Sequence, residues 1–171
     1  MDEIMKSYLA GCIDCDGSIS IKRSTYHMRV IGDAHQPTYS ERIMFKQITP
    51  DVTDLLKKYF GGYARVEKPS CKNGKKLYAW QVTDKQAYEC ATILLPYLKV
   101  KKRQAEIVVE LRKLKSQPKI KRGTYIMTNR WGVDVTIPRR IVDPEITAQK
   151  DILFNKIKSL NDIRTTKPKL V

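Results

Sequence analysis

The chain has 171 residues, of which 42% are hydrophobic, which is enough for a single domain with a sizeable core. Lys and Arg number 33 against 18 Asp and Glu, and the resulting net charge of +15 favours a polyanionic partner. The cations are spread along the chain, no apolar run reaches membrane-spanning length and no secretory leader opens the sequence, so we expect a soluble intracellular protein that binds nucleic acid and has no membrane partner.

The first third of the chain predicts one helix and two strands. Apolar residues at helical spacing predict a helix over 3–13. Alternation of polar and apolar residues predicts a strand over 18–23, and a polar loop follows at 32–40. The next strand is expected over 41–47, with Ile43 and Phe45 on one face and Arg42, Met44 and Lys46 on the other.

The middle of the chain repeats this order. A helix is expected over 49–62, capped by Thr49 and ended by Gly61 and Gly62. Strands over 63–68 and 75–83 are expected to form a hairpin, because Asn73-Gly74 is a strong turn signal. Asp84 is expected to cap a helix over 85–95 that ends at Pro96.

The rest of the chain predicts further helices. The run "KKRQAEIVVELRKLKS" predicts a helix over 101–116, residues 117–140 are predicted to be irregular and basic, and Asp143-Pro144 is expected to open a last helix. The order predicts an α+β fold, αββαββα, with a four-stranded antiparallel sheet and additional C-terminal helices. We expect a single domain over 1–171, with its core in 1–116 and a basic loop and C-terminal helix in 117–171.

One face of this sheet is expected to be apolar and covered by helices, and the other to be polar and cationic. A long uncovered cationic face is unusual for a structural sheet, and β-ribbons can enter the DNA major groove. The facing direction of the fourth strand stays open, because either Tyr78 with Trp80 or Leu77 with Gln81 can face the DNA. The residues predicted to contact DNA are Ser20, Lys22, Ser24, Arg42, Met44, Lys46, Arg65, Lys76, Tyr78 and Gln81, and Ser18 is expected on the same face.

The stretch "LAGCIDCDG" at 9–17 places small residues and two acids at the end of the first helix. Ala10 and Gly11 would allow a partner helix to approach closely. Asp14 and Asp16 lie where the helix dipole is negative and a cation is usual. Two such ends brought together would repel unless a divalent cation lay between them, and carboxylate and carbonyl oxygens suit Mg²⁺. The alternative is a solvated acidic loop.

Cys12 and Cys15 also form a C-x-x-C pair. A structural zinc site needs a second pair of ligands at similar spacing, and the sequence offers none, because His27 and His35 lie in a polar loop without partner cysteines. We therefore expect reduced thiols without a zinc or redox role.

The stretch at 9–17 resembles the LAGLIDADG motif of homing endonucleases. The element order, "FGG" at 60–62 and "LLPYLKVKKRQAE" at 94–106 are similar to that family as well. The resemblance covers roughly residues 4–116. Position 15 is usually small in the family, so Cys15 is the clearest departure.

The resemblance implies a metal-dependent phosphodiester hydrolysis site. By resemblance, Asp16 is the catalytic carboxylate that binds the metal, assisted by the backbone carbonyl of Cys15. The ion is expected to be Mg²⁺ or Mn²⁺, with Ca²⁺ binding without supporting cleavage. Asp14 is expected to be structural. Lys101, with Lys99 as the alternative, would approach the scissile phosphate. Gln47 would complete the site from the end of the second strand, unless it is an ordinary strand-end glutamine.

The chain carries one copy of the motif, whereas the helix-pair geometry of the family needs two. We therefore expect a homodimer whose interface contains Leu9, Ala10, Gly11 and Ile13. The resemblance implies intron homing: double-strand cleavage of a long pseudo-palindromic DNA site, leaving 3′ overhangs. The alternatives are a nucleic-acid-binding protein that does not cleave, such as an intron RNA maturase or a transcriptional regulator, and, ranked last, an intein-embedded nuclease.

Overall fold

The computed structural model describes residues 1–24, 37–69, 74–117, 122–128, 131–140 and 144–162, and the structural statements below concern these residues. The described elements follow one another in the predicted order, with two further strands near the C-terminus. They are α1 (Glu3–Asp16), β1 (Gly17–Ser24), β2 (Thr38–Gln47), α2 (Asp51–Phe60), β3 (Tyr63–Glu67), β4 (Leu77–Thr83), α3 (Asp84–Leu94), α4 (Lys102–Ser116), β5 (Arg122–Thr128), β6 (Asp134–Arg140) and α5 (Pro144–Asp162).

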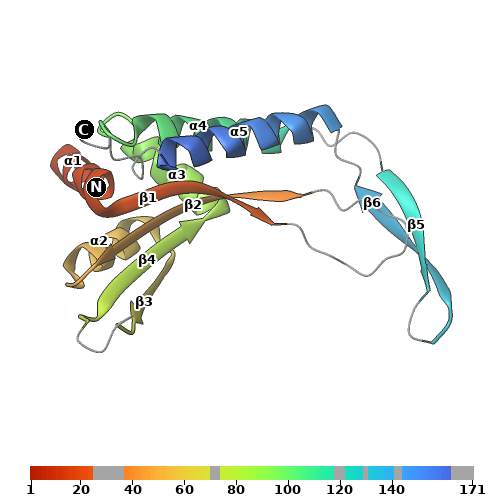
Figure 1. Ribbon diagram of the computed structural model, residues 1–171, viewed down its shortest axis with the longest axis horizontal. Coiled ribbons are helices and arrows are strands. Elements are labelled where there is room, and N and C mark those ends of the chain that lie inside the picture. Colours follow the sequence, from red (N-terminus) through yellow and green to blue (C-terminus); the bar gives the residue numbers. More distant parts are fainter. Residues whose placement is uncertain (25–36, 70–73, 118–121, 129–130, 141–143, 163–171) are drawn as a thin grey trace, which may run out of the picture.

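Strands β1 to β4 form one antiparallel sheet in the order β1-β2-β4-β3, with helices packed against one face (Figure 1). Helices α1, α2 and α3 contact this sheet and one another, and α4 and α5 lie side by side against β1. The predicted α+β fold is confirmed. Among the described helices, none is long and apolar enough to cross a bilayer.

The first helix is longer than predicted and contains both acids of the motif. Asp2 caps its start, because its Oδ1 accepts a hydrogen bond from the backbone N–H of Met5 at 2.7 Å. The helix runs to Asp16 and passes directly into β1 at Gly17. A Cβ at Gly17 would lie 2.7 Å from the carbonyl oxygen of Ile13, so this tight junction requires glycine.

Two predicted helix caps are wrong. α2 starts at Asp51 after Pro50, so Thr49 lies outside the cap position. Asp84 is the first residue of α3 rather than its cap, and its carboxylate instead pairs with Lys115 at 3.1 Å. Gly61, with φ +68°, ends α2 as predicted. Asn73 of the predicted turn and Asp143 lie outside the described residues.

The prediction that 117–140 is irregular is wrong, since β5 and β6 pair as an antiparallel hairpin that stands apart from the four-stranded sheet (Figure 1). Gly132, with φ +77°, lies in the connection between the two strands. Two features of the sequence are typical of strands here: residues 133–137 alternate between apolar and polar, and 124–128 are mostly β-branched or aromatic.

The core fills the space between the four-stranded sheet and the helices. Alternate residues of each central strand point into it, including Ile19, Ile43, Phe45 and Trp80, all about 1% exposed. One carboxylate is buried among them. Glu41 of β2 is fully buried and its Oε2 accepts hydrogen bonds from two cations of α4: Arg112 Nη2 at 3.1 Å and Lys115 Nζ at 2.7 Å.

Candidate active site

The two acids of the motif have different surroundings. The carboxylate of Asp14 accepts three backbone N–H groups just before α4: Lys99 at 2.7 Å, Val100 at 3.1 Å and Lys101 at 2.8 Å. These bonds fix the segment between α3 and α4 against the end of α1. Asp14 therefore has the structural role expected for it, although the loop that it orients is distant in sequence.

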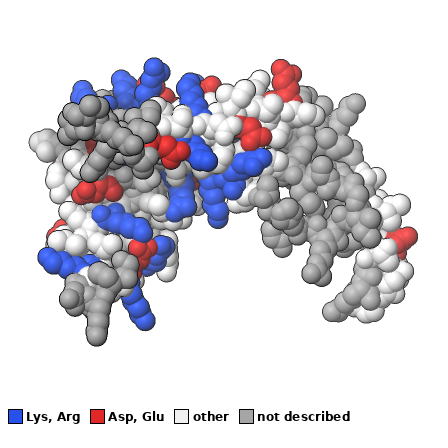
Figure 2. All heavy atoms as spheres, in the orientation of Figure 1, with Lys and Arg blue, Asp and Glu red and all other residues white. Residues whose placement is uncertain are grey.

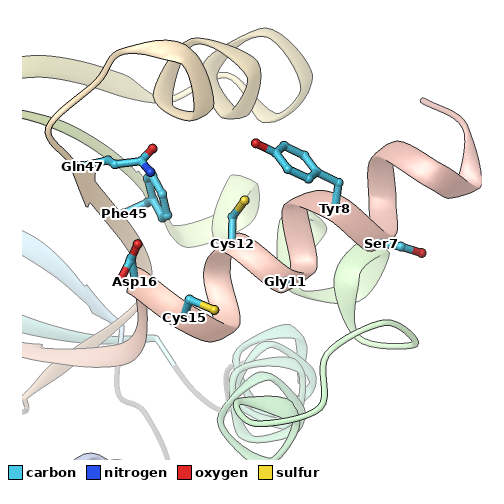
Figure 3. A pocket seen from close by; sticks show the side chains of 8 residues that line it. All are labelled: Ser7, Tyr8, Gly11, Cys12, Cys15, Asp16, Phe45 and Gln47. Atoms are coloured by element: carbon cyan, nitrogen blue, oxygen red, sulfur yellow. The ribbon is translucent and has the colours of Figure 1, made fainter.

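Asp16, by contrast, is exposed and forms no hydrogen bond or ion pair among the described residues. It borders a hollow of about 350 Å³ beside α1. Figure 3 shows the Asp16 carboxylate, the Phe45 ring and the Gln47 amide at one end of this hollow, with Tyr8 further along α1. The lining residues are Ser7, Tyr8, Gly11, Cys12, Cys15, Asp16, Phe45 and Gln47.

Gln47 ends β2 on the face that Ile43 and Phe45 share, as its position in the alternation predicted. Its Oε1 is buried and has no hydrogen-bond donor among the described residues. A buried acceptor without a donor is costly in a protein interior. Gln47 lines the same hollow as Asp16, so a turn of its amide would present this oxygen to a water molecule or a cation there.

Lys101 lies at the other side of the same helix end. The side chain is 3% exposed, and its Nζ donates to the carbonyl oxygen of Ile13 at 2.8 Å and to that of Asp14. A weaker contact of 3.5 Å reaches the carbonyl oxygen of Cys15. The ammonium therefore offsets the negative end of the α1 dipole. The alternative, Lys99, is exposed.

One chain supplies only part of a metal site. The carboxylate of Asp16 and the carbonyl of Cys15 are hard oxygen donors of the kind that Mg²⁺ and Ca²⁺ bind. In the part of the chain that the structure describes, no group of three His, Cys, Asp or Glu side chains could hold a metal ion. The donors present fit a divalent cation, and further donors would have to come from a second copy of the chain or from a substrate.

The predicted dimer interface needs correction. Leu9, Ala10 and Ile13 are each 0% exposed because they face the core of their own chain. Gly11 does lie on the exposed side of α1, where an added Cβ would meet nothing within 4 Å. The exposed side of α1 instead carries a stripe of residues spaced three or four positions apart, which begins at Ile4, 83% exposed. The stripe consists of Ile4, Ser7, Tyr8, Gly11 and Cys15.

The sulfur atoms near this stripe differ in their surroundings. Cys15 is exposed, whereas Cys12 is half-buried and its burial raises the pKa of its thiol. Interaction with Cys12 in turn raises the pKa of the Tyr8 hydroxyl.

The sheet face opposite the helices, here called the open face, carries most of the residues predicted to contact DNA. Strand pairing places Ser20 opposite Arg42, and Met44 opposite Gln81. In Figure 2, Lys and Arg side chains project into the space beneath the helices, between the sheet and the hairpin. The predicted residues on the open face are Ser18, Ser20, Lys22, Ser24, Arg42, Met44, Lys46, Arg65 and Gln81.

Strand pairing also settles the facing direction of β4. Tyr78 pairs with Gln47 and shares the side of Trp80 and Val82, so it points to the helix side and away from the open face. The choice of Tyr78 for the open face is therefore wrong, whereas Gln81 lies there. Lys76 is exposed just before β4.

One open-face residue was missed. Glu67 of β3 forms ion pairs with Lys46 of β2 at 2.6 Å and with Arg65 of its own strand at 2.5 Å. These two cations, Lys46 first, hold the pKa of the Glu67 carboxyl below its ordinary value. The sequence alone does not single out this acid, because its cation partner Lys46 lies 21 residues away on another strand.

Known proteins resemble this chain in structure rather than in sequence. No protein-family model matches the sequence, and a search of curated proteins finds no match. The homing endonuclease I-CvuI, solved in complex with the I-CreI target, has a TM-score of 0.64 at 19% identity, over 99% of this chain and 87% of that chain. I-CvuI complexes were solved with Mg, where the DNA is not cleaved, and with Ca.

Two further homing endonucleases show the same likeness. The archaeal intron-encoded I-Vdi141I, complexed with DNA, has a TM-score of 0.57 at 13% identity, over 94% of this chain and 86% of that chain. I-TnaI has a TM-score of 0.53 at 13% identity, over 92% and 96% of the two chains. The chain therefore has the fold of the LAGLIDADG homing endonucleases, which supports the family that its LAGCIDCDG motif predicts.

Proposed function

We propose that this protein is a sequence-specific endonuclease that cleaves double-stranded DNA as a homodimer in a metal-dependent reaction. The observation that carries the proposal is that Asp16 and Gln47 line one exposed hollow, which lies beside the sheet whose open face is cationic. The structures that the chain resembles include DNA complexes of homing endonucleases, which supports DNA as the substrate.

The homodimer follows from the incompleteness of one chain. Asp16 is the single acid among the described residues that line the hollow, and Asp14 is occupied by three backbone N–H groups. A twofold dimer through the exposed stripe of α1 would bring two Asp16 residues into one site. Gly11 removes side-chain bulk at the middle of that stripe, which permits close approach of a second α1.

Each residue then has a distinct role in phosphodiester hydrolysis. Asp16, with the Cys15 carbonyl, would hold Mg²⁺ or Mn²⁺, which when bound lowers the pKa of a water molecule and stabilises charge on phosphate oxygens. Gln47, by turning its amide oxygen into the hollow that it lines, would accept a hydrogen bond from the attacking water and orient it. Lys101, which already lies against the carbonyls of α1, supplies positive charge near the negative phosphate.

The open face would read DNA. Two such faces related by a twofold axis fit a long pseudo-palindromic site, one half to each copy, and cleavage of both strands is proposed to leave 3′ overhangs. Lys22, Arg42, Lys46 and Arg65 are the cations available for phosphate and base contacts. Affinity should fall steeply as salt rises, since such contacts release counterions from DNA.

The test begins with selection of bound duplexes from a randomised DNA pool. The enriched duplex is then incubated with Mg²⁺ and with wild-type protein, Asp16→Asn or Asp54→Asn. Asp54 is an exposed acid on α2, so its variant controls for the loss of one surface charge. We expect Asp16→Asn to bind the duplex without cutting it, and Asp54→Asn to cut like the wild type.

Two other outcomes are informative. Wild-type protein that binds the selected duplex and never cuts it with Mg²⁺ or Mn²⁺ would favour a binding role, such as that of a maturase or a regulator. Cutting by Asp16→Asn at the wild-type rate would contradict the catalytic role of Asp16.

A further inference from the structure

An ionic cluster spans three strands of the open face. Lys46 on β2 and Arg65 on β3 both bind the carboxylate of Glu67, and β4 lies between these two strands in the sheet. Lys46 Nζ donates to Oε2 at 2.6 Å, and Arg65 donates to Oε1 through Nε at 3.1 Å and through Nη2 at 2.5 Å. The carboxylate therefore uses one oxygen for each cation.

The strand between them leaves room for this bridge. Ala79 of β4 pairs with Lys46 on one side and with Arg65 on the other. Its methyl side chain is too short to separate them, so Lys46 reaches across β4 to the acid on β3. Both cations remain 42% exposed, and the side chain of Glu67 is 23% exposed. The cluster is thus an accessible part of the open face with a net charge of +1.

The hydrogen-bond pattern determines what Arg65 can still bind. A guanidinium has five N–H donors in a fixed planar fork. Nε and Nη2 are committed to Glu67, which leaves both hydrogens of Nη1 and the second hydrogen of Nη2. These form the end of the fork, and two parallel donors are what guanine O6 and N7 accept in the major groove. Glu67 restricts the rotation of the side chain and so fixes the direction of that end.

We propose that Glu67 is a specificity-determining residue that positions Arg65 and Lys46 to read a G·C pair in each half-site. The proposal rests on the proposed function, since it needs DNA on the open face. This role also explains why an acid lies on the open face, where a further cation would increase the affinity for DNA. Glu67 lowers non-specific attraction to phosphate and converts two mobile cations into an oriented pair of donors.

The place of the cluster on the sheet predicts where this base pair lies. Lys46 directly precedes Gln47, which lines the hollow together with Asp16. Lys22 and Ser40 pair towards the opposite end of β2. The G·C pair should therefore lie in the part of each half-site nearer the cleaved bonds, and Lys22 should act on base pairs further out.

The experiment compares the base preferences of four proteins by selection from a randomised duplex pool without Mg²⁺, so that cleavage plays no part. They are wild type, Glu67→Gln, Arg65→Lys and Glu110→Gln. Arg65→Lys keeps the charge and removes the planar fork. Glu110 is an exposed acid on α4, in the helix layer, so its variant controls for the same loss of charge.

We expect the wild type to select a guanine at one twofold-related position. Glu67→Gln and Arg65→Lys should both lose discrimination at that position, by a factor of about 5 to 150, the range typical of one bidentate contact. Glu110→Gln should retain the wild-type preference. Thermal unfolding of all four proteins should be similar, because the cluster lies on the surface.

Three results would overturn the inference. The first is that Glu67→Gln retains every wild-type base preference. The second is that Glu67→Gln and Arg65→Lys lose discrimination at different base pairs. The third is that Glu67→Gln loses affinity uniformly for all sequences. A wild-type protein that enriches no sequence would be a separate failure, because it contradicts the proposed function itself rather than the role of Glu67.

Discussion

Replacing Asp14 with alanine removes the acceptor for three backbone N–H groups at the start of α4. The bonds join the last turn of α1 to residues 99–101, more than 80 positions away in sequence. Without the carboxylate, these N–H groups must find water or remain unpaired. The substitution should therefore destabilise the fold as a whole, because it weakens the attachment of α4 to the end of α1, which the bonds of Lys101 Nζ alone would then hold.

The structure sets the size of this effect. A hydrogen bond to a charged group contributes about 1.5–3 kcal/mol, and two of the three bonds are exposed, so we take about 4 kcal/mol for the set. Removing a negative charge from the C-terminal end of a helix returns up to about 1 kcal/mol. The net loss should be about 3 kcal/mol, which corresponds to a Tm lower by about 6–12 °C for a chain of this length.

Urea unfolding followed by circular dichroism, at one fixed protein concentration, measures this loss. Asp16→Asn is the matched variant, since Asp16 lies two residues further on and has no described partner. Its free energy of unfolding should stay within about 0.5 kcal/mol of the wild type. Equal losses in the two variants, or a loss below about 1 kcal/mol for Asp14→Ala, would refute this division of roles.

Three other predictions use different parts of the molecule. Gly11→Leu should raise the free energy of unfolding of one chain by up to about 1 kcal/mol, since the position is open and leucine favours the helix, but should give monomers in sedimentation where the wild type should give dimers. In peptide mapping after brief alkylation, Cys15 should react before Cys12, because burial and a raised pKa leave Cys12 with less thiolate, and Cys90 should react last. Glu41→Gln should cost about 2 kcal/mol in urea unfolding, because it leaves two partly buried cations of α4 without their carboxylate; an unchanged midpoint would contradict this.

Much of the fold and part of the site could be predicted because the signals are local. Alternation along β2 identified the face of Gln47, and the motif with its helix spacing placed Asp16 at the end of α1. Alternation of polar and apolar residues indicates which side chains of a strand face the core, because residues two positions apart lie on the same face. This pattern is weaker over 122–140, because Tyr125, Ile126 and Met127 interrupt the alternation along β5.

What could not be predicted depends on contacts between distant segments. The first helix has apolar residues on two sides, and only the docking of α1 on the sheet decides that Leu9 and Ile13 are buried and Tyr8 is exposed. The partners of Asp14 lie beyond position 98, and Lys46 reaches Glu67 across an intervening strand. No local pattern encodes such pairings, since the strand order and the helix packing bring them together.

In the proposed dimer, two copies of the chain contribute Asp16 to each complete site. Equal amounts of wild-type and Asp16→Asn chains, unfolded and refolded together, should pair at random, so about one quarter of the dimers would carry two intact carboxylates. Cleavage of single strands of the selected duplex with Mg²⁺, measured on a denaturing gel so that nicks are counted, should then fall to about one quarter of the value for the same total amount of wild-type protein. A value of about one half would mean that each copy carries a complete site on its own, and would contradict the account.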